Sequence, residues 1–224
     1  MSAESAMPAR QSAPLRTPDV VPQLPSWSGP VLGEEARMLA SLTAARAGNS
    51  IAFEAIYRAL APRLSRYARG LVGQDAEDVA AEAWLQIVRD LHKFDGDWDA
   101  FRGWAARIVR NRAIDHLRAA ARRPARAATV DVLLDKAATE DTAGAAEEAL
   151  STAEAIDLIA SLPPDQAEAV LLRAVVGLDA KAAGAVLGKR PGAVRVAAHR
   201  GLRTLAEQIR SSNGRVPDAA GQVS

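Results

Sequence analysis

Apolar residues recur every three to four positions along most of this chain, and no stretch alternates apolar and polar residues long enough to predict a β-strand. The pattern is strongest over residues 50–73, where the apolar positions follow the 3.6-residue period of an α-helix: Phe53, Ile56, Leu60, Leu64, Tyr67 and Leu71. Pro62 lies inside this segment and predicts either a kink or a split into two helices. Similar patterns over 34–48, 75–94 and 101–123 make the predicted fold class all-α.

Changes in composition divide the chain into two small helical domains joined by a flexible linker. Residues 1–33 carry six prolines among Ser, Ala and Gly, so we predict a disordered extension. The first helical domain covers 34–121 and the second covers 152–211. Between them, residues 122–151 are rich in Ala, Thr and acids, which predicts an acidic flexible linker, and 212–224 form a disordered tail.

Charge is balanced over the whole chain but strongly uneven along it. The net charge is only +1, yet residues 102–126 hold eight arginines and one acid. Residues 131–157 hold eight acids and one lysine, and 179–210 again hold seven bases against two acids. The basic segments therefore suggest nucleic-acid contacts rather than a generally cationic protein.

Composition excludes several functional classes. The chain has no cysteine, which rules out disulfides and permits a reducing compartment. No apolar run reaches the length of a membrane span and no secretory signal is visible, so we expect a cytoplasmic protein without membrane insertion. His92, His116 and His199 are isolated, and no phosphate-binding glycine loop is present. We therefore predict no catalytic site, no metal and no cofactor.

Residues 180–210 have the pattern of a helix-turn-helix. A short helix is followed by a turn at Gly188, and Pro191 begins a longer helix, where a proline costs no hydrogen bond. One stripe of the longer helix is apolar: Val194, Ala198, Gly201, Leu202 and Leu205. The opposite stripe is basic, as expected for a helix that enters the major groove. A helical hairpin with a solvated basic face is the alternative, and Gly184 inside the short helix costs about 1 kcal/mol relative to Ala.

Residues 75–94 predict an amphipathic helix with Asp75 as its N-cap. The expected apolar face consists of Val79, Ala80, Ala83, Trp84, Ile87, Val88 and Leu91. The opposite face is charged except at Leu85, and it carries Asp78, Glu82 and Arg89. This outer face is either ordinary solvated surface or a surface for a protein partner.

Residues 101–118 segregate rings from guanidinium groups on one predicted helix. Phe101, Trp104, Ala105 and Ile108 form a core face, and the other face holds Arg107, Arg110, Asn111, Ile114 and Arg118. Trp98 falls in a turn-rich segment that predicts a loop. Two interpretations stay open for its ring: stacking on an unpaired base, or folding back as a lid on the core.

Segments 75–94, 101–118 and 160–205, in this order with an acidic linker, resemble the extracytoplasmic-function (ECF) sigma factors of bacterial RNA polymerase. The resemblance spans about 34–210 and implies two domains, sigma region 2 and sigma region 4. It implies core RNA polymerase as partner, through its β′ clamp helices and β flap, together with promoter DNA and an anti-sigma factor.

The resemblance also implies site residues. It implies that the outer face with Asp75, Asp78, Glu82 and Leu85 docks on the polymerase. Recognition and melting of the −10 element fall to Phe94, Trp98, Arg107, Arg110, Asn111, Asp115 and Arg118. Reading of the −35 element falls to Arg190, Arg195, Val196, His199, Arg200 and Arg203. The alternatives are a stand-alone helix-turn-helix regulator and an interaction module that binds an acidic protein.

Overall fold

The computed structural model describes residues 32–122 and 143–213, and within these ranges every regular element is a helix. The N-terminal module contains α1 (Leu32–Arg46), α2 (Ser50–Val72), α3 (Ala76–Asp90) and α4 (Trp98–Arg122). The C-terminal module contains α5 (Ala143–Ala160), α6 (Pro164–Val170), α7 (Ala180–Leu187) and α8 (Pro191–Asn213). A π-helical turn, Leu171–Val175, continues α6. The all-α fold class is confirmed.

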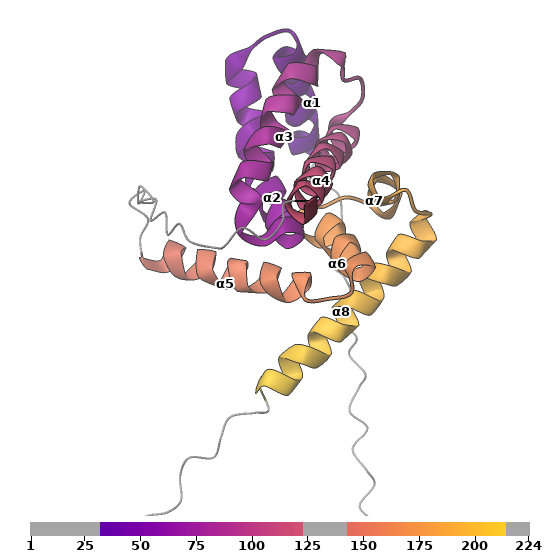
Figure 1. The fold of residues 1–224 in the computed structure, drawn as a ribbon. Coiled ribbons are helices and arrows are strands. Elements are labelled where there is room, and N and C mark those ends of the chain that lie inside the picture. Colours follow the sequence, from indigo (N-terminus) through magenta and orange to yellow (C-terminus); the bar gives the residue numbers. More distant parts are fainter. Residues whose placement is uncertain (1–31, 123–142, 214–224) are drawn as a thin grey trace, which may run out of the picture.

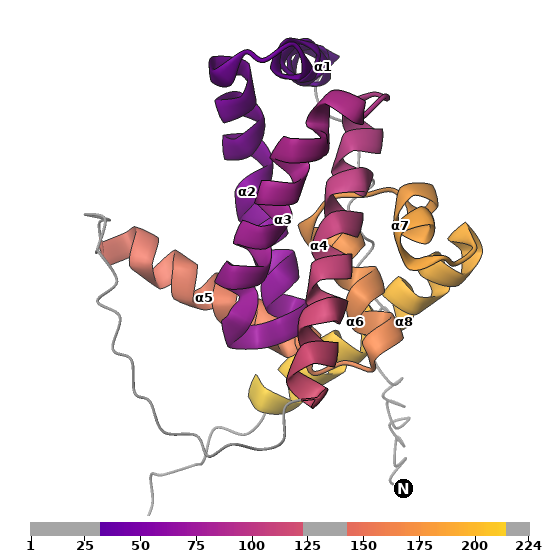
Figure 2. The ribbon, with the colours of Figure 1, turned by 45° about the horizontal axis from the view of Figure 1, so that its top comes forward.

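The N-terminal module is a bundle in which α2, α3 and α4 lie side by side and α1 packs across one end (Figures 1 and 2). The predicted stripe of α2 forms its core, since Ile56, Leu60, Leu64 and Tyr67 are fully buried. Helix α2 runs unbroken through Pro62, so of the two alternatives, a kink or a split, the split is excluded. The proline is exposed, which leaves water free to hydrate the carbonyl that loses its helical partner.

The C-terminal module has the predicted helix-turn-helix. Asp179 caps α7 by accepting a hydrogen bond from the Ala182 amide at 2.6 Å, and α7 ends at Gly188 with φ of +66°. Gly184, which the sequence presents only as a cost, is required here. A Cβ at this position would lie 2.6 Å from the Lys189 carbonyl oxygen, because the turn passes directly over α7.

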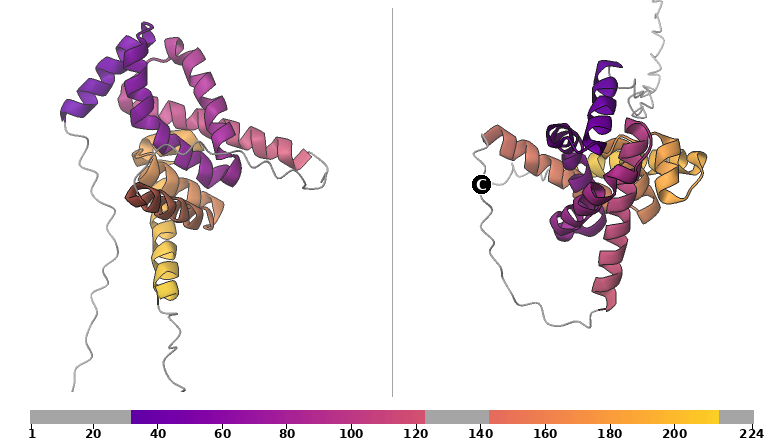
Figure 3. Two further views of the ribbon diagram at one scale, coloured as in Figure 1. Left: turned by 90° about the vertical axis from the view of Figure 1, so that its left-hand side faces the viewer. Right: turned by 90° about the horizontal axis from the view of Figure 1, so that it is seen from above.

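The two modules pack against each other (Figure 3), and their buried residues form one continuous core. Leu171 is fully buried, and α2 comes so near it that a Cβ added at Gly70 would lie 2.5 Å from Leu171 Cδ1. Helix α5 begins at Ala143, inside the segment predicted as linker. The remainder of that linker, most of the N-terminal extension and nearly all of the C-terminal tail lie outside the described residues.

Candidate nucleic-acid interfaces

Helix α3 presents an exposed acidic face with an apolar patch. Asp78 and Glu82 are both exposed, and Leu85 is 72% exposed between them and the end of the helix. The predicted apolar face was too wide, because Val88 is 53% exposed rather than buried. Val88 follows Leu85 by three residues, so the two side chains share the outer side of the helix. The prediction missed Val88, although its spacing from Leu85 was a signal that could have identified it.

Asp75 joins the acidic face to the basic helix α4 instead of capping α3. Its side chain makes no capping hydrogen bond. A 3₁₀ turn at Gly73–Asp75 precedes the helix, so the backbone of Asp75 lacks the extended conformation that an N-cap residue usually adopts. The carboxylate lies 2.9 Å from Nε2 of His116 in α4. Asp75 is exposed, as are Asp78, Glu82 and Leu85, so the structure brings the four predicted residues to the surface.

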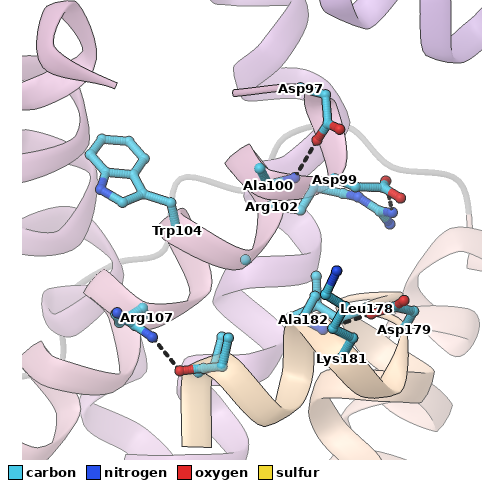
Figure 4. A pocket seen from close by; sticks show the side chains of 13 residues that line it. Asp97, Asp99, Ala100, Arg102, Trp104, Arg107, Leu178, Asp179, Lys181 and Ala182 are labelled. Atoms are coloured by element: carbon cyan, nitrogen blue, oxygen red, sulfur yellow. Dashed lines mark hydrogen bonds and ion pairs between the residues drawn. The ribbon is translucent and has the colours of Figure 1, made fainter. Parts of the chain in front are cut away.

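Trp98 is the first residue of α4, and the prediction of a loop position is wrong. Asp97 accepts a hydrogen bond from the Ala100 amide at 2.8 Å, so the helix starts one residue after this cap (Figure 4). The Trp98 ring is 7% exposed and stacks on Phe101 with centroids 5.7 Å apart. In this conformation it acts as a lid on the core, the second of the two interpretations.

A cavity of about 480 Å³ opens beside the segment between α3 and α4, within the size range of small-ligand sites. Phe94 and Trp104, whose centroids are 5.1 Å apart, supply its aromatic wall. Asn111 and Arg107 supply polar groups from α4. The Lys93 ammonium, 3.1 Å from the Asp90 carboxylate at the same cavity, lowers the pKa of Asp90. The site thus combines a stacking surface with hydrogen-bonding edges.

Part of the basic face of α4 contacts the C-terminal module. Arg107 donates a hydrogen bond to the Ala185 carbonyl of α7 (Figure 4), and Arg110 forms a 3.1 Å ion pair with Glu168 of α6. Farther along α4, Asn111, Asp115 and Arg118 are exposed. Asp115 lies 3.8 Å from Arg118, and it also contacts Arg112 at 3.5 Å. Arg107 is exposed as well, so of the predicted face only Arg110, which is partly buried, is not fully open.

Helix α8 exposes every residue predicted to face DNA: Arg190, which immediately precedes the helix, and Arg195, Val196, His199, Arg200 and Arg203. The opposite stripe is buried, with Val194 at 0%, Ala198 at 1% and Leu205 at 7% exposure. Arg203 is paired with Glu207 at 3.1 Å, the one acid of this face anticipated from the sequence. The surface matches that of a recognition helix.

In the described ranges, no helix is both long and apolar enough to cross a bilayer. The same residues contain no group of three or more His, Cys, Asp or Glu side chains that could hold a metal ion.

Comparisons with known proteins connect these surfaces to a family. Residues 56–123 match the model of Sigma-70 region 2, and residues 152–205 match that of Sigma-70, region 4. The ECF RNA polymerase sigma factor SigD of Mycobacterium tuberculosis is 33% identical over 77% of this chain and 84% of its own length. The ECF RNA polymerase sigma factor BldN of Streptomyces coelicolor is 31% identical over 79% of this chain and 67% of its own length.

Two solved structures share the fold. CnrH, in complex with the cytosolic domain of CnrY, superposes with a TM-score of 0.56 and 22% identity over 78% of this chain and 98% of CnrH. The sigma factor RpoE, in complex with the anti-sigma factor NepR from Bartonella quintana, gives 0.52 and 19% over 70% of this chain and 96% of RpoE.

Proposed function

The chain belongs to the ECF RNA polymerase sigma factors, and from that premise we propose which of its surfaces performs which step. As a sigma factor it binds core RNA polymerase and directs promoter-specific transcription initiation. The match of residues 56–123 to region 2 favours this function over a stand-alone helix-turn-helix regulator. We infer that the chain acts in the cytoplasm as a binding subunit and leaves the catalysis to the polymerase.

The outer face of α3 is the proposed docking surface for the β′ clamp helices. Asp75, Asp78 and Glu82 supply negative charge that steers association, and Leu85 supplies an apolar anchor. Val88 extends the anchor by one turn. An exposed leucine and valine surrounded by acids fit a protein partner better than solvent.

The docking proposal is tested by replacing Asp78 and Glu82 together with Lys. Both side chains are exposed, so helical content should be retained while binding to core polymerase is lost in a pull-down. The double variant Glu34→Lys with Glu35→Lys makes the same charge change in the first turn of α1 and serves as the control. Equal binding by both double variants would remove α3 from the interface.

The cavity beside Phe94 is the proposed pocket for an unstacked base of the −10 element. Extruding a base costs a few kcal/mol, which stacking on Trp104 and hydrogen bonding to Asn111 offset, while Phe94, 8% exposed, backs the Trp104 ring. Arg107, Arg110 and Arg118 then hold the strand by its phosphates, with Asp115 orienting Arg118. Trp98 supports the pocket from inside the core and does not itself contact the base.

The exposed face that begins at Arg190 and continues along α8 is the proposed reader of the −35 element. Arg195, His199 and Arg200 offer hydrogen bonds to base edges or phosphates, and Val196, 50% exposed, offers an apolar contact for a thymine methyl group. Arg190 and Arg203 extend the basic surface on either side.

The observation that carries the proposed function is the presence, in one chain, of an acidic docking face, an aromatic cavity with a basic helix, and a separate recognition helix. Size-exclusion chromatography with core polymerase, followed by run-off transcription on sheared genomic DNA, tests it. Co-elution with discrete transcripts is expected. Tight binding to duplex DNA without co-elution would favour the stand-alone regulator. Because RpoE is bound by an anti-sigma factor, we also propose such a partner for this chain.

A further inference from the structure

A groove of about 830 Å³ lies between the start of α6 and the first two turns of α8. Its wall on α8 consists of small or apolar residues: Gly192, Ala193, Val196 and Ala197. Gly192 and Ala193 are exposed and Val196 is 50% exposed, so this wall is open to a binding partner. The groove is therefore an apolar patch on the otherwise basic surface of the recognition helix.

The opposite wall adds few groups that could form hydrogen bonds with a partner. Pro163 and Pro164 have no backbone N–H, and the amide oxygen of Gln166 is buried. Of the described residues that line the groove, Asp165 is the only acid, and its carboxylate lies 2.7 Å from the Lys189 ammonium. The middle of the groove is therefore apolar, and it selects a partner by apolar contact instead of by hydrogen bonds.

The borders of the groove favour DNA as its occupant. Arg200 lines the groove, and Arg190 and Arg195 are exposed within two residues of other lining residues. Guanidinium groups attract the phosphates of a duplex. In a helix-turn-helix, the N-terminal residues of the second helix contact the base edges. An apolar wall bordered by cations therefore matches a base edge that lies between two phosphate backbones.

The C5 methyl group of a pyrimidine is the feature of a base edge that this wall can detect. In the major groove, thymine presents this methyl group beside its O4 acceptor, and cytosine presents its N4 amino group. Ala193, Val196 and Ala197 are three and four residues apart, so their methyl groups share one side of the helix. These side chains have no donor for O4 and no acceptor for N4. The wall therefore detects the methyl group and not the pyrimidine that carries it.

We propose that Ala193, Val196 and Ala197 read the C5 methyl group of a pyrimidine in the −35 element, and that they accept 5-methylcytosine as well as thymine. The inference rests on the proposed function of α8 as the −35 reader and adds the chemical feature that the helix selects. Burial of one methyl group changes affinity about fourfold. Methylation of a cytosine at this position therefore strengthens binding, and the modification state of the promoter changes its occupancy.

Binding of matched duplexes by the full-length chain assembled with core polymerase tests the proposal. Selection from duplexes with a randomised −35 region first supplies the preferred element, which should contain thymine. Replacing each thymine in turn by uracil removes only the methyl group and should weaken binding about fourfold at the position that α8 reads. At that position, 5-methylcytosine should bind about fourfold more tightly than cytosine. A preferred element without an A·T pair, or equal binding within both matched pairs at every position, would overturn the proposal.

A truncation assigns the methyl contact to its side chain. Val196→Ala should reduce the preference for thymine over uracil from about fourfold to about twofold or less. Ile209→Ala is the matched control, because Ile209 is also a β-branched residue of α8, is 49% exposed, and lies about 20 Å farther along the helix axis. Both side chains are exposed, so both variants should retain their helical content. Equal preferences in the two variants would contradict the assignment.

The same assays separate this inference from the proposed function. If the chain and core polymerase select no sequence from the pool, the proposed function fails, and this inference fails with it. If Val196→Ala lowers run-off transcription while the thymine and uracil duplexes bind equally, the groove contacts the polymerase and not a base. That result would overturn the reading of a methyl group and leave the proposed function intact.

Discussion

The substitution Gly184→Ala in α7 distinguishes a local effect, helix propensity, from a tertiary effect, crowding against the turn. The two predict opposite changes in the free energy of unfolding. Alanine in a helix interior is favoured over glycine by about 1 kcal/mol, so helix propensity alone predicts a more stable protein. In the structure, the added Cβ would lie 2.6 Å from the Lys189 carbonyl oxygen and 3.6 Å from the Pro191 nitrogen. Both are backbone atoms of the turn, so neither can rotate away.

The magnitude follows from this crowding. Overpacking costs typically about 1–3 kcal/mol, and the upper half of that range applies when the obstacle is backbone. The turn is also held to α7 by a hydrogen bond from the Lys189 amide to the Gly184 carbonyl at 2.9 Å, which any shift would strain. Subtracting the gain in propensity leaves a net loss of about 1–2 kcal/mol.

Urea unfolding of the full-length chain, followed by circular dichroism, measures the effect. Gly192→Ala is the matched control, because it lies in the first turn of α8 with nothing within 4 Å of the added Cβ. The control should be neutral or slightly stabilising, and Gly184→Ala should lower the midpoint. A raised midpoint for Gly184→Ala would refute the reasoning that the turn, and not helix propensity, selects glycine.

Three further outcomes are expected. Tyr67→Phe should raise the urea midpoint slightly, because it removes a buried hydroxyl that has no partner; a lowered midpoint would mean that the hydroxyl is bonded. Arg69 lowers the pKa of Asp157 in the folded protein below its value near 4 in the unfolded chain. The pair therefore adds stability at pH values above the unfolded-state pKa, and this stability is lost as the pH falls through the folded-state pKa. Between pH 6 and 3.5 the wild type should therefore lose more stability than Asp157→Asn, and equal losses would exclude the pair. Arg195→Ala with Arg203→Ala should flatten the salt dependence of duplex binding by about 1.8 log–log units, and an unchanged slope would remove both from the DNA face.

Much of the fold was predictable from the sequence because amphipathic helices are encoded locally. The stripe of α2 from Ile56 to Tyr67 is buried as predicted, and Gly188 and Pro191 lie at the turn and the helix start that the sequence placed there. The exposed faces of α3 and α8 follow from the same periodicity. Each of these features depends on residues within one or two helical turns of one another.

Only the tertiary structure decided how the modules meet and which predicted residues they cover. Arg69 and Asp157 are 88 positions apart, and Arg110 and Glu168 are 58 apart, so no local pattern could pair them. Trp98 enters the core because Asp97 caps α4 and the helix begins at the next residue. The turn-rich sequence around it did not determine at which residue the helix begins. Helical periodicity determines which side of a helix is buried, but the packing of distant segments determines what buries it. For Arg110, that packing supplies an acidic partner, Glu168, from the other module.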